Sequence, residues 1–271
     1  MAKALPRFTE HEGHAKLEPI TSPTVPARYF RAFLDDFRHR SGRETAEITV
    51  LDVGCGRGDT VAWLCDSGWD AYGLDIDERY LAQGRDYVER SGRGDRLRLL
   101  EGRYPFPDQT FDVILSDQVI EHVADLDQFC SEVARVSKVG GVGLHVFPAR
   151  WRPVESHLLA PVVHWLPKGR ARRLALRPLL AMGLAAPYFG DRPLSERVEI
   201  YGHYSDTETF YRGLRELQQT CRRHGLAPDV NEAARAKIGD RLPRMPAALA
   251  NLAAMAYRHT FSVYLKTQRT S

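Results

Sequence analysis

The apolar positions of the chain follow two spacings, which predict buried strands that alternate with amphipathic helices. Short apolar runs rich in β-branched residues predict strands, and apolar residues three or four positions apart predict helices. The predicted strands cover residues 48–53, 72–75, 97–100, 112–116, 142–147, 226–231 and 260–266. Helices are predicted at residues 25–40, 60–67, 78–90 and 207–224, and from Asp125 to the pair Gly140 and Gly141. This alternation favours an α/β fold.

The first strand leads directly into a glycine-rich turn. Residues 48–53 are mostly apolar, and Gly54, Gly56 and Gly58 follow them before the next helix. The second strand then ends at Asp75. A unit of this kind lets a ligand approach the backbone at a helix N-terminus, while the carboxylate accepts hydrogen bonds from two ribose hydroxyls.

The spacing of the glycines indicates which nucleotide would bind. A dinucleotide fingerprint requires a glycine at position 59, where this chain has Asp59. The strings LDVGCGRGD and GLDID instead resemble the S-adenosylmethionine (SAM) site of class I methyltransferases. The resemblance implies a seven-stranded mixed α/β sheet with helices on both faces and an antiparallel last strand. A glycine-rich turn without a ligand is the alternative, and the match over the whole unit argues against it.

The resemblance also implies how SAM would be held. Gly54 and Gly56 would pass under its methionine part, and Asp75 would hold its ribose. Asp52 would orient the loop or meet the ammonium group of SAM. Further cofactor contacts are expected from Cys55, Ile76, Arg103, Tyr104, Asp117, Gln118 and His122.

One departure from the family pattern concerns how the adenine ring of SAM would be recognised. The acidic residue that the family places in the loop after the third strand is missing, and Gly102, Arg103 and Tyr104 stand there instead. Adenine recognition would then use backbone groups or stacking on Tyr104.

Polar side chains follow the fourth strand and end the fifth. In open α/β sheets ligands bind beyond the carboxyl ends of the strands. This topology places Asp117, Gln118, Glu121 and His122 beside the sulfonium of SAM. His145 lies about two residues from the carboxyl end of the fifth strand, which makes it the first candidate for a general base. The alternative for His145 is a core histidine that is hydrogen-bonded to the backbone.

Residues 149–205 are too many for an ordinary connection, and they predict a helical lid inserted after the fifth strand. The expected organisation is an N-terminal arm and cap helix at 1–46, a SAM-binding domain at 47–148 and 206–271, and this lid, which would bind the acceptor. Candidate acceptor-binding residues are Trp151, Glu155, His157, His203 and Tyr204. Packing within the lid or at a helix entry is the alternative for the aromatic and histidine residues.

The stretch HVFPARWRPVESH resembles methyltransferases of bacterial glycan and natural-product pathways. We therefore expect O-methylation of a carbohydrate hydroxyl, on a mannoside, an oligosaccharide or a glycosylated natural product. The apolar stretch at 174–189 favours a second reading, methylation of a lipid, quinone or other small hydrophobic acceptor. A SAM-binding regulatory protein without turnover is the alternative from another class. Glu155, Asp117 and Glu121 are candidate ligands for Mg²⁺, although no ligand spacing indicates a metal.

Composition adds little to the prediction of function. The 271 residues carry a formal net charge of +3, which gives no reason to expect a nucleic-acid partner. The four cysteines lie too far apart for a zinc or redox motif, the N-terminus lacks the apolar core of a signal peptide, and no apolar stretch is long enough to span a bilayer. A cytoplasmic protein is therefore expected, and a homodimer is compatible with the sequence.

Overall fold

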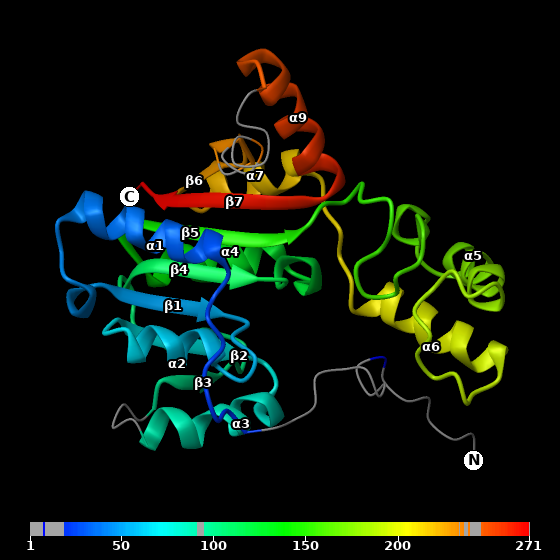
Figure 1. Cartoon of the computed structure of the whole chain (residues 1–271), viewed down its shortest axis with the longest axis horizontal. Helices are drawn as coiled ribbons and strands as arrows, with labels where there is room; N and C mark the ends of the chain where they lie inside the picture. Colours follow the sequence, from blue (N-terminus) through cyan, green and yellow to red (C-terminus); the bar gives the residue numbers. More distant parts are fainter. Residues whose placement is uncertain are drawn as a thin grey trace.

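The computed structural model describes residues 8, 19–90, 95–232, 234–235, 238 and 245–270. Its centre is a seven-stranded sheet in the order β3-β2-β1-β4-β5-β7-β6, in which only β7 runs antiparallel to the others (Figure 1). The strands are β1 (Thr49–Val53), β2 (Asp70–Asp75), β3 (Leu97–Leu99), β4 (Phe111–Asp117), β5 (Ser137–Pro148), β6 (Leu226–Asp229) and β7 (Ser262–Arg269). The predicted mixed α/β sheet with an antiparallel last strand is confirmed.

Helices cover both faces of this sheet. The helices of the described chain are α1 (Arg28–Ser41), α2 (Asp59–Asp66), α3 (Glu78–Arg90), α4 (Leu126–Val136), α5 (Arg170–Ala181), α6 (Leu194–Thr207), α7 (Leu214–Arg223) and α9 (Ala247–Thr260), of which α5 and α6 lie apart from the sheet. The first three pack on one face, where Leu64 and Leu81 meet Val50 of β1. On the other face α4 and α7 pack over Leu51. Successive residues of β1 thus enter opposite hydrophobic cores, as expected of a strand buried on both sides.

Two predicted helix boundaries were wrong, each for a tertiary reason. α4 ends at Val136 rather than at the glycine pair, because Ser137 already pairs with Phe111 of β4. Gly140, whose φ is +79°, lies in an irregular part of β5 instead. The helix expected from residue 207 begins at Leu214. Hydrogen bonds described below hold residues 208–213 against the turn after β4, so this segment is not free to continue a helix.

A lid stands beyond the carboxyl ends of the parallel strands (Figure 1). Within it α5 and α6 enclose a hydrophobic core of their own, which includes Leu176 and Tyr201. Phe8, from the N-terminal arm, is buried in this core and stacks on Tyr204, with 4.3 Å between the ring centroids. The predicted arm otherwise lies, over residues 1–7 and 9–18, outside the described residues.

The segment before α1 contacts α3 and the first residue of α2. Ile20 is buried, and its N–H donates to the carbonyl of Gln83 in α3 over 3.1 Å. The N–H and hydroxyl of Thr24 both donate to Asp59 Oδ1, at 3.2 and 3.1 Å. The arm therefore contacts both α2 and α3 and, through Phe8, the lid. None of the helices among the described residues has the length and apolar character needed to cross a bilayer.

A buried ion-pair network joins the strands at their amino ends. Asp112, near the start of β4, accepts hydrogen bonds from Lys138 Nζ at 2.8 Å, Arg43 Nη1 at 2.7 Å and the N–H of Thr49 at 2.9 Å. Burial alone would raise the pKa of Asp112, but these donors hold it below the usual value. The carboxylate thus joins β1, β4 and β5 at the edge of the sheet opposite the lid.

Asp112→Ala should lower the free energy of unfolding by about 3 kcal/mol, because it leaves several donors without their buried acceptor. Since the folded pKa is depressed, this stabilisation is present above about pH 4 and is lost as the pH falls further. Urea unfolding at pH 7 and pH 3 measures both effects. Asp112→Asn, which keeps an acceptor but no charge, should lose less. Equal losses in the two variants would show that the charge is not involved.

Candidate active site

The glycine-rich turn after β1 adopts a conformation that only glycine accommodates well. Gly54 has a φ of +73°, and a Cβ there would lie 2.3 Å from Val119 Cγ2. The N–H groups of Gly54 and Cys55 donate to the carbonyl of Leu74, at 2.7 and 3.1 Å. Asp75, at the end of β2, accepts a hydrogen bond from the N–H of Gly56 at 2.8 Å. The turn is therefore held against the end of β2.

Three carboxylates gather at this edge of the sheet, on β1, β2 and β4. The pKa of Asp52 is raised to about 8 by burial and by the charges of Asp117 and Asp75. The pKa of Asp117 is also raised, first by burial and then by Glu121, although the Tyr29 hydroxyl donates to it at 2.9 Å. Such a group favours a ligand with positive charge. The ammonium and sulfonium of SAM fit this requirement, and Tyr29 brings α1 over the same site.

The structure separates Ile76 from two other predicted cofactor contacts, Arg103 and Tyr104, of which Tyr104 was the predicted stacking partner of the adenine. The Ile76 side chain, directly after Asp75, is 77% exposed and presents an apolar surface at the carboxyl edge. Tyr104 is instead buried in the core beneath the sheet, and Arg103 is exposed and pairs with Asp108 and Glu132. In this conformation Ile76 is available to cover an adenine ring, whereas Tyr104 is packed away from solvent.

The turn after β4 and the lid bring a second polar group together. Glu121 and His122 lie in the short helix η3 (Ile120–His122), and His157 comes from the lid. His157 Nε2 lies 3.8 Å from Glu121 Oε1, and the two histidine rings meet edge to face with centroids 4.8 Å apart. The Tyr204 ring of α6 lies 5.8 Å from that of His157. Burial alone would lower the pKa of His157, but the nearby glutamates raise it. The surroundings of His157 therefore favour a positive charge at this position.

The segment between α6 and α7 fixes this turn to the lid. His122 Nδ1 lies 2.7 Å from the carbonyl of Glu208, and the N–H of Phe210 donates to the carbonyl of Glu121 over 2.6 Å. The Arg212 guanidinium donates to the carbonyls of Ile120, Val123 and Ala124. Sequence reasoning missed Arg212, because no local pattern distinguishes it from a surface arginine. It acts as a positioning residue for the turn.

His145 lies in the core and not at an acceptor site. It is fully buried, and its Nδ1 and Nε2 lie 2.8 Å from Ser116 Oγ and 3.5 Å from Thr267 Oγ1. Burial lowers its pKa to about 4. Both ring nitrogens thus face neighbouring strands, so the geometry corrects the choice of His145 as first candidate base and favours a hydrogen-bonded core histidine. Its partners are side chains rather than the backbone groups expected.

The predicted acceptor-binding residues do not all lie at the group formed by Glu121 and His122. Glu155 is buried inside the lid, where it accepts hydrogen bonds from the N–H groups of His157 and Leu158 and from the Tyr211 hydroxyl. It therefore braces the loop that carries His157. His203 is exposed on α6, and Trp151 is exposed near the base of the lid. Only His157 and Tyr204 join the group at Glu121.

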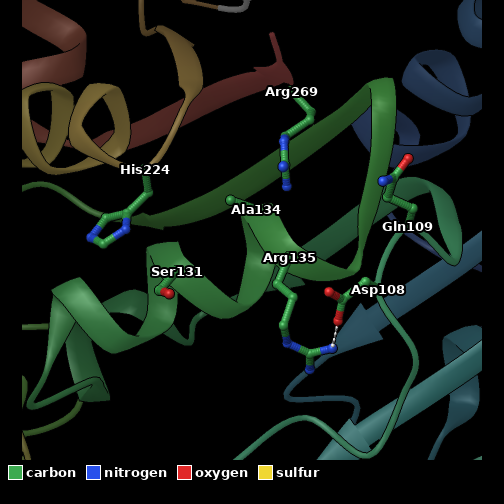
Figure 2. A pocket seen from close by; sticks show the side chains of 7 residues that line it. All are labelled: Asp108, Gln109, Ser131, Ala134, Arg135, His224 and Arg269. Carbon is green, nitrogen blue, oxygen red and sulfur yellow. Dashed lines mark hydrogen bonds and ion pairs between the residues drawn. The ribbon is translucent and has the colours of Figure 1, made fainter. Parts of the chain in front are cut away.

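A polar hollow of about 270 Å³ lies elsewhere on the molecule (Figure 2). Asp108 and Gln109 precede β4, Arg269 ends the antiparallel β7, and Arg135 pairs with Asp108 at 2.8 Å. These positions place the hollow at the amino edge of the sheet, opposite the glycine-rich turn. It is not part of the site described above.

Comparison with known proteins identifies the family to which the chain belongs. A family model for a methyltransferase domain matches residues 51–144. A ubiquinone biosynthesis O-methyltransferase of Sinorhizobium medicae is 30% identical over 183 residues, which cover 62% of this chain and 72% of that protein. The chain belongs to the class I SAM-dependent methyltransferases. This methyltransferase is also 35% identical over 99 residues to a sterol 24-C-methyltransferase of Gibberella zeae, but spans only 26% of that protein.

Among solved structures, the methyltransferase resembles a geranyl diphosphate C-methyltransferase from Streptomyces coelicolor. The two share a TM-score of 0.50 at 15% identity, over 89% of this chain and 77% of the other. At this identity the likeness supports the fold alone.

SAM binding to the methyltransferase should release a proton from Asp52. With a pKa near 8, this carboxyl holds a proton at pH 7, whereas the positive charges of SAM favour the carboxylate. SAM affinity should therefore rise from pH 6 toward pH 8, by up to about tenfold per pH unit. Calorimetry in buffers with different ionisation enthalpies measures the proton. Asp52→Asn should abolish its release, and unchanged release in this variant would assign the proton to another group.

His145→Asn should affect the stability of the methyltransferase and not its chemistry. We expect a loss of about 1–3 kcal/mol in the free energy of unfolding, from a smaller side chain and lost hydrogen bonds. Because the folded pKa of His145 is lowered, wild-type stability should fall between about pH 6.5 and pH 4, and the variant should lose this dependence. Urea unfolding measures both. A stable variant whose kcat falls about 10²–10⁴-fold would restore His145 as the base.

Proposed function

We propose that this methyltransferase transfers the methyl group of SAM to a hydroxyl oxygen of a small acceptor with an apolar ring, such as a phenol or quinol. The observation that carries the proposal is the meeting of Glu121, His122 and His157 between the end of β4 and the lid. The three carboxylates of the proposed SAM site lie at the same carboxyl edge. We propose residues 149–205 as the acceptor-binding lid.

The chemistry of a hydroxyl acceptor explains why such a group is useful. SAM supplies a methyl group on a positively charged sulfur, and its transfer to oxygen is an in-line displacement that depends on alignment. A hydroxyl must also lose its proton as the new bond forms. We place that proton transfer at the group of Glu121, His122 and His157, in place of His145.

The apolar acceptor is favoured over the carbohydrate expected from the sequence. The Tyr204 ring faces His122 and His157, and Phe8 stacks behind it, so an aromatic wall borders the polar group. A planar ring packs well against such a wall. The name of the relative from Sinorhizobium medicae, a ubiquinone biosynthesis O-methyltransferase, supports the same acceptor class.

A carbohydrate acceptor remains the second candidate because of two exposed tryptophans. Trp151 and Trp165 are 47% and 42% exposed, and their rings meet edge to face with centroids 5.9 Å apart. Exposed aromatic rings of this kind can stack on the apolar face of a sugar. An oligosaccharide would then lie along the lid and present one hydroxyl to His157.

A panel of phenols, quinols and glycosides, with release of S-adenosylhomocysteine as the readout, tests the activity. Methylation of a phenol or quinol is expected, and His157→Gln should lower kcat about 10²–10⁴-fold because proton removal is impaired. SAM affinity should stay unchanged, since His157 belongs to the lid.

The same panel separates the alternatives. If only glycosides are methylated, and Trp151→Ala raises their KM, the carbohydrate candidate is correct. SAM binding without turnover of any acceptor would favour a regulatory protein. A His157→Gln variant with full activity would remove His157 from the chemistry.

A further inference from the structure

We propose that Glu121, His122 and His157 bind one divalent first-row transition-metal ion at the junction of the sheet and the lid. Resting on the proposed function, we further infer that this ion receives the acceptor hydroxyl. Among the described residues, this is the only group of at least three histidine, cysteine or acidic side chains whose ligand atoms all lie within 4.8 Å of one another. The two supporting elements, η3 and the lid loop before Leu158, are far apart in sequence.

The first argument is an uncompensated buried carboxylate. Glu121 is 1% exposed, and neither of its carboxylate oxygens has a hydrogen-bond partner in the described part of the chain. A buried charge is costly unless it is paired or coordinates a metal. A protonated His157, 3.8 Å from Oε1, would offset the charge but still leave Oε2 without a donor. A cation between the carboxylate and the two imidazoles satisfies all three groups.

The second argument is the orientation of His122. Its Nδ1 lies 2.7 Å from the carbonyl oxygen of Glu208, which can only accept, so Nδ1 carries the hydrogen. In the neutral ring the lone pair is then on Nε2. Metal-bound histidines typically donate their other N–H to a backbone carbonyl in this way, which fixes the tautomer. The Nε2 of His157 likewise has no hydrogen-bond partner among the described residues.

The ligand set favours a transition metal over Mg²⁺. Two imidazole nitrogens and one carboxylate suit Zn²⁺, Mn²⁺, Fe²⁺ or Co²⁺, whereas Mg²⁺ prefers oxygen ligands and water. Metal–ligand bonds are about 2.0–2.2 Å long, so ligand atoms now up to 4.8 Å apart must move closer. Because His157 belongs to the lid, metal binding draws the lid loop toward η3. Three protein ligands leave a coordination position open for an acceptor oxygen.

The ion would assist the proton removal placed at this group, because an acceptor hydroxyl bound to it is more acidic, as bound water is, and its proton can leave to solvent. The oxygen then forms a bond to the methyl carbon while the carbon–sulfur bond of SAM breaks. The electron pair of that bond stays on sulfur, which leaves S-adenosylhomocysteine as a neutral thioether. No oxidant or reductant is required.

Calorimetric titration of the chelator-treated protein with ZnCl₂, MnCl₂ and MgCl₂ tests the site. We expect one Zn²⁺ per chain with a micromolar or lower Kd, and Mg²⁺ binding at least 100-fold weaker. Glu121→Gln and His157→Gln should each weaken Zn²⁺ binding at least 100-fold. His39→Gln, which removes an exposed histidine of α1, should leave it unchanged. A cooperative urea-unfolding transition checks that each variant is folded, and Co²⁺ absorption bands that the two site variants lack give a second readout.

Two results would overturn the metal site. One is the absence of Zn²⁺ or Mn²⁺ binding tighter than millimolar, and the other is tight binding that survives both Glu121→Gln and His157→Gln. Full methyl transfer in the presence of a chelator would refute the role of the ion in the reaction while leaving the proposed function intact. Site-specific Zn²⁺ binding without turnover of any acceptor would instead support the metal site and refute the proposed function.

Discussion

The accumulation of negative charge at the carboxyl edge of the sheet is the constraint on which the site depends. Asp52, Asp75, Asp117 and Glu121 all lie there, and burial first, then the charge of neighbouring carboxylates, raises the pKa of Asp52 and Asp117. The free energy of folding cannot favour such an arrangement by itself, since each carboxylate loses hydration and gains a like-charged neighbour. Positive charge on a bound ligand would offset the repulsion at this edge, so the electrostatics of the fold favour the binding of a cationic cofactor.

The second constraint is how the lid is attached. Hydrogen bonds from residues 208–213 reach the backbone of η3, and Arg212 donates to three of its neighbouring carbonyls. Backbone carbonyls are present whatever the side chains, so the lid is positioned through contacts that do not depend on the acceptor. Among the side chains of the group at Glu121, that of His122 also takes part in the attachment through its hydrogen bond to Glu208, whereas the Glu121 carboxylate has no hydrogen-bond partner among the described residues.

The parts predicted correctly are those that local pattern determines. The strand around Val50 and Leu51, the glycine-rich turn at Gly54 and the strand that ends at Asp75 all lie within about thirty residues, and adjacent strands bring them together. The meeting of Glu121 with His157 depends instead on a lid whose path the sequence does not reveal. His145 was placed near the correct edge, but its burial follows from β7, which pairs with β5 and contributes Thr267. The helix propensity of residues 208–213 was likewise overridden, because these residues form tertiary hydrogen bonds instead of the expected helix.

The lid core is assembled from two distant parts of the chain. Residues 149–205 supply most of it, yet Phe8 fills the space between Tyr188, Tyr201 and Tyr204. A chimera that exchanges only the inserted segment between related methyltransferases would therefore place a foreign aromatic cluster against the original Phe8. The lid core is therefore discontinuous in sequence, and transferring the lid intact to another sheet requires the N-terminal arm to be transferred with it.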